Sequence, residues 1–379
     1  MPVTGLAPAL GSLVGRIADD IHAKVRIPGP AQIRAQALHT EEHVGDDFAV
    51  WCELLAHRAA ALWVLKTIYI RVLEDRGLLT PVRILDPESQ LLFGQLAPDL
   101  GAAAYLQWCF RDLAMGGLAE LFTPQATEIV TPSDALCSEL LEFWRHRDPD
   151  THTLTWSFED ERFDGRLMGD LYQDLDPVVG ERYAFCQTPD FVLELMLDQT
   201  LTPAMARWGA DVVRVIDPSC GSGHFLLAAL KRIVDQMRLD TPDRPVTDVV
   251  TDALSRVHGI DINDYAASLA RARLVMSALE LCGLDDIRDA GQFHPLVFWA
   301  DALEQVERDR DYQPNMDLFS EESPAPVAFP GMTPEEARRA LAPHLKAKYH
   351  VIVANPPYIV ERDAAKKAYH RGKIVVGKT

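Results

Sequence analysis

The sequence lacks several features that would point to particular classes of protein. Its six cysteines form no C-x-x-C pair, so neither a zinc site nor a disulfide framework is indicated, and we expect no metal. Its formal net charge at pH 7 is −19, which argues against a general nucleic-acid coat, because such proteins are basic. An enzyme that acts on nucleic acid is not excluded, since one local basic face is enough for it.

Signals for export or membrane insertion are also missing. The N-terminus has no basic segment followed by an apolar core, so we predict no signal peptide. The most apolar stretch, residues 59–73, contains Lys66 and Arg71 and is too short to span a bilayer. We therefore expect a cytoplasmic protein without a membrane partner. Its 379 residues leave room for two or three domains and a sizeable core.

The first part of the chain is dominated by helical periodicity. Apolar residues recur at helical spacing over three stretches, at about 46–75, 100–121 and 133–144. Gly77 stands where a C-cap glycine is expected after the first of them. Residues 1–40 are mixed, with a loop at Pro28-Gly29-Pro30. We predict an all-α domain at about 1–165, whose sequence alone does not reveal a function.

The rest of the chain is organised around residues 212–230. The β-branched run Val212–Ile216 predicts a buried strand, and apolar residues from Phe225 onward predict a helix. Between them lies a turn containing Asp217, Pro218, Cys220, Gly221 and Gly223. A strand, a glycine turn and a helix in this order are typical of the first unit of a nucleotide-binding α/β fold. The glycines allow close backbone approach to a ligand, and the start of the helix favours negative charge.

Polar residues follow each of the later predicted strands. Asp261 ends the strand at 256–262, and Asp301 follows the short strand at 296–299. An acidic residue at the end of the second strand is where this fold class holds a ribose. After a charged and proline-rich insertion at about 304–345, the strand 349–354 ends in Asn355-Pro356-Pro357-Tyr358. Upstream, Thr188 and Pro189 suit the cap and first position of a helix.

These motifs carry a family resemblance. D-P-S-C-G-S-G at 217–223, followed by N-P-P-Y at 355–358, resembles the S-adenosyl-L-methionine-dependent DNA amino-methyltransferases of the N6-adenine group. T-P at 188–189 resembles the cofactor motif that precedes the glycine turn in the gamma arrangement. G-D-L-Y at 169–172 and L-E-D-R-G-L-L at 73–79 resemble the large methyltransferases of type I, type IIG and BREX phage-defence systems. The resemblance implies a Rossmann-like, partial methyltransferase domain at 166–379.

The resemblance also implies roles for individual residues in transfer to DNA. The carbonyls of Asn355 and Pro356 would accept the two N–H bonds of a target adenine, and Pro357 would stiffen the loop. Tyr358 would stack on that base, which must be flipped out of double-stranded DNA to reach it. Since methyl transfer is an in-line displacement, positioning and electrostatics matter more than proton abstraction.

A second group of residues is assigned to the cofactor by the same resemblance. Gly221 and Gly223 would admit its methionine moiety, and Asp217 would hold its ammonium group. Asp261 would hold the ribose hydroxyls and Asp301 the adenine amine. The remaining cofactor positions implied by the motifs are Thr188, Pro189, Pro218 and Cys220.

Two alternatives to an adenine-specific DNA methyltransferase stay open. N-P-P-Y also serves methyltransferases that act on a glutamine side chain of a protein or on a guanine of RNA. The chain ends at Thr379, soon after Tyr358, where the family continues with further strands and a target-recognition domain. We therefore expect either a fragment or a protein completed by a partner chain. A non-catalytic remnant that binds cofactor or a partner is the other alternative.

Overall fold

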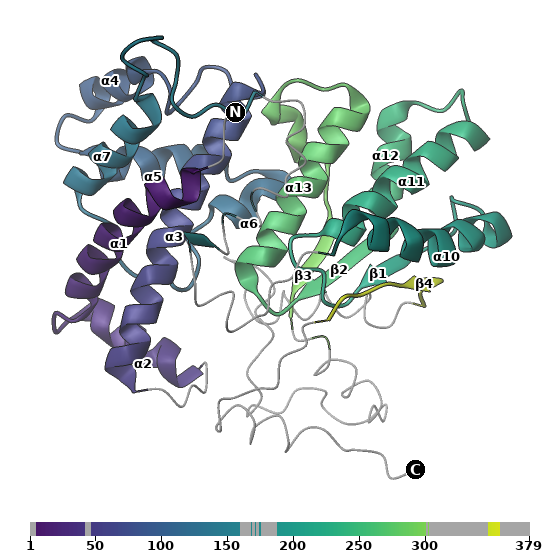
Figure 1. Ribbon diagram of the computed structural model, residues 1–379, viewed down its shortest axis with the longest axis horizontal. Helices are drawn as coiled ribbons and strands as arrows, with labels where there is room; N and C mark the ends of the chain where they lie inside the picture. The colour runs from purple at the N-terminus through teal and green to yellow at the C-terminus, as the bar shows by residue number, and fades with distance from the viewer. Residues whose placement is uncertain are drawn as a thin grey trace.

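The computed structural model describes most of the helical part and most of the strands. The described residues are 5–41, 47–159, 168, 171, 174–175, 188–300, 302 and 348–356. Helices α1 to α7 form one group of elements, and the sheet with helices α10 to α13 forms the other (Figure 1). The predicted insertion at 304–345 and the domain boundary predicted near residue 165 lie outside the described residues.

The helices predicted for the first group are present, but one of them is divided into shorter helices. Their bounds are α1 Leu6–Val25, α2 Pro30–Glu41, α3 Phe48–Asp75, α4 Pro87–Leu96, α5 Ala102–Leu113, η1 Gly116–Leu118, α6 Ala119–Phe122 and α7 Asp134–Arg145. The single helix expected over 100–121 is therefore wrong. Helix α5 ends at Leu113, and the chain continues through the short helices η1 and α6. Within η1, a Cβ at Gly117 would lie 2.3 Å from Cγ2 of Val275. The backbone turns there to pack directly on a neighbouring helix.

Helix α1 was not predicted from the mixed residues 1–40. It is 20 residues long and buries one face against α3, with Leu10, Ile17 and Ile21 almost fully enclosed. These positions follow the spacing of an amphipathic helix. The signal was therefore in the sequence. The predicted loop at Pro28-Gly29-Pro30 separates α1 from α2, which begins at Pro30.

Helix α3 is the central helix of this group. The carboxylate of Asp47 caps it by accepting a hydrogen bond from the backbone N–H of Ala49 at 2.8 Å. It ends as predicted at Gly77, where Gly77 N–H donates to Glu74 O and Leu78 N–H donates to Leu73 O. This is the Schellman arrangement.

By length and composition alone, α3 could cross a membrane. It runs for 28 residues, so the expectation that this apolar stretch is too short was wrong. The length of α3 is weak evidence for a membrane, because 61% of the most apolar 18-residue stretch of the helix is buried inside the protein. Burial of that kind is what a core helix shows.

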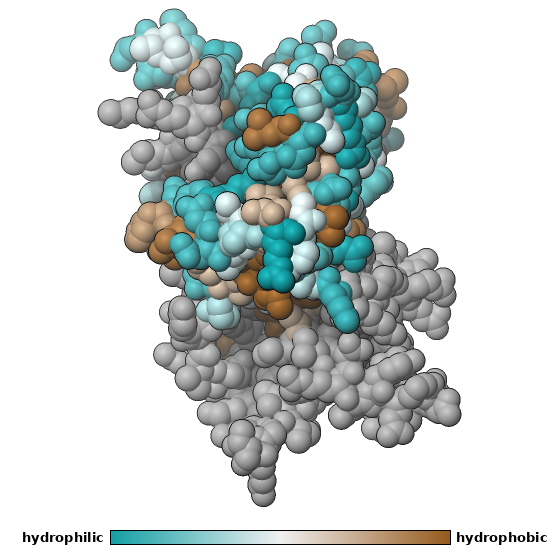
Figure 2. All heavy atoms as spheres, turned by 90° about the vertical axis from the view of Figure 1, so that its right-hand side faces the viewer, coloured by the Kyte–Doolittle hydropathy of each residue, from teal (hydrophilic) through white to brown (hydrophobic). Residues whose placement is uncertain are grey.

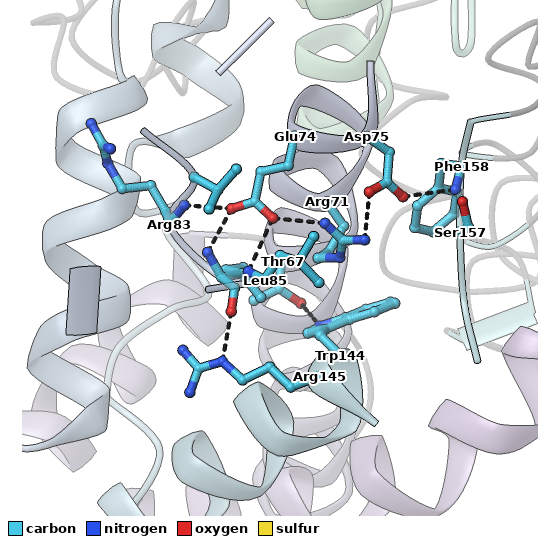
Figure 3. Close-up of polar contacts among 12 residues, drawn as sticks. Thr67, Arg71, Glu74, Asp75, Arg83, Leu85, Trp144, Arg145, Ser157 and Phe158 are labelled. Atoms are coloured by element: carbon cyan, nitrogen blue, oxygen red, sulfur yellow. Dashed lines mark hydrogen bonds and ion pairs between the residues drawn. The ribbon is translucent and has the colours of Figure 1, made fainter. Parts of the chain in front are cut away.

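A buried polar network joins the end of α3 to the following loop (Figure 3). The guanidinium of Arg71 donates to Glu74 at 2.7 Å and to Asp75 at 2.6 Å. Glu74 also accepts from the backbone N–H groups of three loop residues, Arg83, Ile84 and Leu85. Glu74, in the L-E-D-R-G-L-L motif at 73–79, therefore holds the following loop against the end of α3.

The sheet is parallel and has the strand order β3-β2-β1-β4. The strands are β1 Val215–Asp217, β2 Val257–Asp261, β3 Leu296–Trp299 and β4 Val351–Ile352. All four lie within the predicted stretches or one residue beyond them, which confirms an α/β, Rossmann-like sheet. Strand β1 stands between β2 and β4, so the strand order reverses beside it. Ligands of open α/β sheets bind at the carboxyl ends of the strands at such a point.

The helices that connect the strands lie along one face of the sheet (Figure 1). They are α11 His224–Asp240, α12 Val246–Leu254 and α13 Asp264–Cys282, while α10 Asp190–Trp208 packs on α11. The side that carries α10 to α12 is mainly hydrophilic, with separate apolar patches (Figure 2). Helix α13 is different, because it is buried along nearly its whole length between the sheet and the helical group.

Candidate functional site

The glycine turn lies at the carboxyl end of β1 and is fixed by backbone hydrogen bonds. The N–H of Cys220 donates to the carbonyl of Ile260 at 3.0 Å, and the N–H of Gly223 donates to the carbonyl of Cys220 at 2.8 Å. Gly221 and Gly223 have φ values of 53° and 84°, which favour glycine. The sequence prediction of a tight glycine turn before helix α11 is therefore confirmed.

Cys220 is part of this turn, and its side chain is buried. A Cβ added at Gly259 of β2 would lie 3.0 Å from its sulfur, so the thiol packs directly on the neighbouring strand. Burial raises the pKa of the Cys220 thiol well above its usual value. Any contact of Cys220 with a ligand would therefore come from its backbone.

Asp261, at the end of β2, is attached to the glycine turn. One carboxylate oxygen accepts from the N–H of Gly221 at 2.7 Å, and the other accepts from the N–H of Asn263 at 2.8 Å. Burial raises the pKa of Asp261 to about 6, against the lowering effect of these two hydrogen bonds. Each oxygen keeps a second lone pair, so the carboxylate can still accept from ligand hydroxyls.

Asp217, at the end of β1, is almost completely buried, with 1% of its surface exposed. Its carboxylate accepts from the N–H of Ser219 at 3.0 Å. Burial raises its pKa to about 8, and the nearby charge of Asp261 raises it further. The neutral acid is therefore favoured at pH 7, and a cation brought beside it would favour the ionised form.

The burial of Asp217 predicts a dependence of stability on pH. The folded protein holds this proton more tightly than the unfolded chain, whose Asp has a pKa near 3.9. Its contribution to stability is present in full below that value and is lost as the pH rises toward about 8. Asp217→Asn, which keeps the acceptor but cannot ionise, should gain stability relative to the wild type by at most about 1.4 kcal/mol per pH unit.

Urea unfolding of both proteins between pH 5 and pH 9 measures this difference. Groups that titrate alike in the two proteins cancel in the comparison. Parallel pH profiles would contradict the burial of an ionisable Asp217.

Asn355 and Thr188 meet across 167 positions of the chain. The amide nitrogen of Asn355 donates to the hydroxyl of Thr188 at 3.1 Å. Asn355 and Pro356 follow β4, the neighbour of β1, and Thr188 and Pro189 directly precede α10. Thr188 is 6% exposed, so it is a fixed partner. This contact uses the nitrogen of the amide and leaves its oxygen as the acceptor that can face a ligand.

The structure thus gathers most of the predicted site residues at one edge of the sheet. Asp217, Asp261 and Asn355 follow three adjacent parallel strands, β1, β2 and β4. Asp301, Pro357 and Tyr358 lie outside the described residues, so their roles stay predictions. Pro218 lies in the glycine turn, directly after β1.

Two residues of the site were missed from the sequence. Ile262 directly follows Asp261, and 53% of its surface is exposed. The indole N–H of Trp299, at the end of β3, donates to the carbonyl of Ile262 at 2.9 Å. The only signal in the sequence was an apolar residue directly after the strand-end acid, and its exposure became visible only in the structure.

Comparisons with known proteins agree with the motifs. Residues 255–379 match the family described as Eco57I restriction-modification methylase. The chain is 32% identical over 369 residues to the adenine-specific methyltransferase PglX of Streptomyces coelicolor, covering 90% of this chain and 30% of the relative. It is 33% identical over 109 residues to the adenine-specific methyltransferase BrxX of Escherichia coli O9:H4, covering 28% of this chain and 8% of the relative.

Two solved structures are also similar to this chain. A nuclease-deletion mutant of the Type ISP restriction-modification enzyme LlaGI, in complex with a DNA substrate mimic, matches with a TM-score of 0.47 and 12% identity, over 94% of this chain and 24% of that one. The DrdV–DNA complex matches with a TM-score of 0.47 and 14% identity, over 97% of this chain and 30% of that one.

The parallel sheet, the glycine turn and the later N-P-P-Y motif are consistent with an α/β methyltransferase fold. The resemblance to the adenine-specific methyltransferases of modification and phage-defence systems is confirmed by the match over residues 255–379 and by the similarity to PglX. The chain spans less than a third of the length of the curated relatives that it matches. The activity, substrate and partners of the whole protein are therefore matters of proposal.

Proposed function

We propose that this chain transfers a methyl group from S-adenosyl-L-methionine to the N6 amine of adenine in DNA, in a modification or BREX-type phage-defence system. The observation that carries the proposal is the hydrogen bond between Asn355 and Thr188. It joins the N-P-P-Y motif to the T-P motif at the sheet edge that bears the glycine turn. Three motifs that are far apart in the sequence thus share one site.

The residues at this edge fit the cofactor. Gly221 and Gly223 form a turn with positive φ values at the carboxyl end of β1, where a ligand of this fold would bind. Asp261 presents carboxylate lone pairs for a ribose, and the exposed side chain of Ile262 offers an apolar surface to an adenine ring. An ammonium group beside Asp217 would compensate for the buried carboxylate. When bound, the cofactor supplies a methyl group on a sulfonium, which is activated for displacement.

Asn355 would then orient the amine that receives the methyl group. The lone pair of the adenine N6 amine is delocalised into the ring, which makes this nitrogen a poor nucleophile. An amide oxygen held at a fixed point can accept one N–H bond and direct the lone pair toward the methyl group. Thr188 supplies the fixed point by binding the amide nitrogen. Pro356 would accept the second N–H bond with its carbonyl, and Pro357 and Tyr358 would complete the base pocket.

The substrate would be double-stranded DNA from which the target adenine is flipped. Target recognition would be supplied by a further segment or a partner chain. A site of action in the cytoplasm, where bacterial DNA lies, follows from the proposal.

Replacement of Thr188 by valine tests the anchor of Asn355. Thr188→Val keeps the shape of the side chain but removes the acceptor, so kcat for methyl transfer should fall by about ten-fold, while Kd for S-adenosylhomocysteine stays within about two-fold. Thr188→Ser should restore most of the rate. A rise in Kd as large as the loss in kcat would instead assign Thr188 to the cofactor pocket.

A transfer assay distinguishes the proposed substrate from the alternatives. The purified chain is supplied with methyl-labelled S-adenosylmethionine and, in separate reactions, unmethylated genomic DNA, transfer RNA or a cell-free protein fraction. Label in DNA alone is the expected result. Label in RNA or protein alone would replace the proposal with one of the other two substrate classes.

A further inference from the structure

The structure assigns Arg273 as a positioning residue for the glycine turn, which it holds from the side opposite to the ligand; this inference rests on the proposed function. Arg273 belongs to α13 and is 5% exposed. One guanidinium nitrogen donates to both the carbonyl oxygen and the hydroxyl oxygen of Ser222, at 2.7 and 3.0 Å. Ser222 lies between the two glycines of the turn and is itself 4% exposed.

The peptide unit between Ser222 and Gly223 is held at both of its polar ends. Its carbonyl oxygen accepts from Arg273, and its N–H donates to the carbonyl of Cys220. A peptide unit is planar, so these two contacts fix the orientation of the plane. The glycines on either side have conformational freedom that the contacts remove. The direction of the first N–H groups of α11 is set at this point.

A second contact from α13 supports the same part of the turn. A Cβ at Gly223 would lie 2.9 Å from the Cβ of Ala270, so the backbone of the turn rests directly on α13. Ala270 and Arg273 are three residues apart and share one face of the helix. One residue supports the turn by close packing, and the other holds it by charge-assisted hydrogen bonds, which are stronger than neutral ones.

The same arginine lies beside the helical group. Its positive charge acts on the buried phenol of Tyr69 in α3, against the strong rise in pKa that burial causes there. Nearer the start of α13, Arg58 of α3 forms an ion pair with Asp264. Helix α13 therefore contacts both α3 and the turn. The helical group, for which the sequence indicated no function, would then support the glycine turn through α13.

The test uses the full chain and calorimetric titration with S-adenosylhomocysteine. Arg273→Met keeps the length of the side chain but removes the donors, and Kd should rise about ten-fold. Arg273→Lys keeps one charged donor and should recover part of the loss. Arg271→Met is the matched control, because Arg271 is a buried arginine of the same helix that donates to the carbonyls of Pro295 and Val297 instead. It should bind within about two-fold of the wild type.

A second readout reports on the turn itself. Hydrogen exchange of the peptides covering residues 217–227 should accelerate in Arg273→Lys and not in Arg271→Met. This readout also decides the case in which Arg273→Met fails to fold. Equal Kd values in wild type, Arg273→Met and Arg273→Lys, or equal loss in Arg271→Met, would overturn the inference. A wild-type chain that is folded but binds no S-adenosylhomocysteine would overturn the cofactor part of the proposed function, which is a different result.

Discussion

Asn355→Ala should lower kcat for methyl transfer by about 10²- to 10³-fold. This is the size of effect seen when one preorganised hydrogen-bonding group is removed from an active site. In the proposed mechanism, the amide oxygen of Asn355 acts only on the amine that receives the methyl group, and the amide nitrogen donates to the hydroxyl of Thr188 at 3.1 Å. The substitution therefore removes orientation of the nucleophile without touching the glycine turn.

Cofactor affinity provides the control for this variant. Asn355 follows β4, whereas the turn and Asp261 follow β1 and β2. Kd for S-adenosylhomocysteine should stay within about two-fold of the wild-type value, and the thermal midpoint should change little, because Asn355 is only partly buried. Wild-type kcat in Asn355→Ala would remove the N-P-P-Y motif from the mechanism.

Glu74→Ala should lower the free energy of unfolding by about 3–5 kcal/mol, the usual cost of breaking a buried ion pair. The Glu74 side chain is completely enclosed and binds Arg71 together with three backbone N–H groups of the following loop. Arg71 would keep Asp75 as a partner, but the backbone donors would lose their acceptor.

Glu88→Ala is the matched control for Glu74→Ala. Glu88 is an exposed glutamate in the first turn of α4, and its loss should change the free energy of unfolding by no more than about 0.5 kcal/mol. Glu74→Gln should fall between the two, because its amide oxygen still accepts hydrogen bonds but carries no charge. Urea unfolding followed by circular dichroism measures all three variants. Equal stability of the two alanine variants would show that the network is not required.

The sheet could be predicted because its signals are local. The strand 296–299 was predicted with its observed bounds, and Asp261 was correctly placed at the end of β2. A β-branched run followed by glycine and proline needs no distant contact to be recognised. The Schellman end of α3 at Gly77 was predictable for the same reason.

The contacts that define the site were not predictable, because they join distant parts of the chain. Nothing in a single sequence pairs Asn355 with Thr188 or Arg273 with Ser222. The close packing of Gly117 on Val275 of α13, after helix α5 has ended, likewise joins distant parts of the chain. Motifs therefore indicated which residues matter, and the structure supplied the partners that fix them in place.

The identity of the methylated base tests the central claim most directly. Unmethylated DNA is incubated with the chain and labelled S-adenosylmethionine, digested to nucleosides and analysed by mass spectrometry, with Asn355→Ala as the parallel sample. We predict label in N6-methyladenine with the wild type and an initial rate of labelling about 10²- to 10³-fold lower with Asn355→Ala. Label in a cytosine product, or no label in DNA from a folded chain that binds the cofactor, would contradict the account.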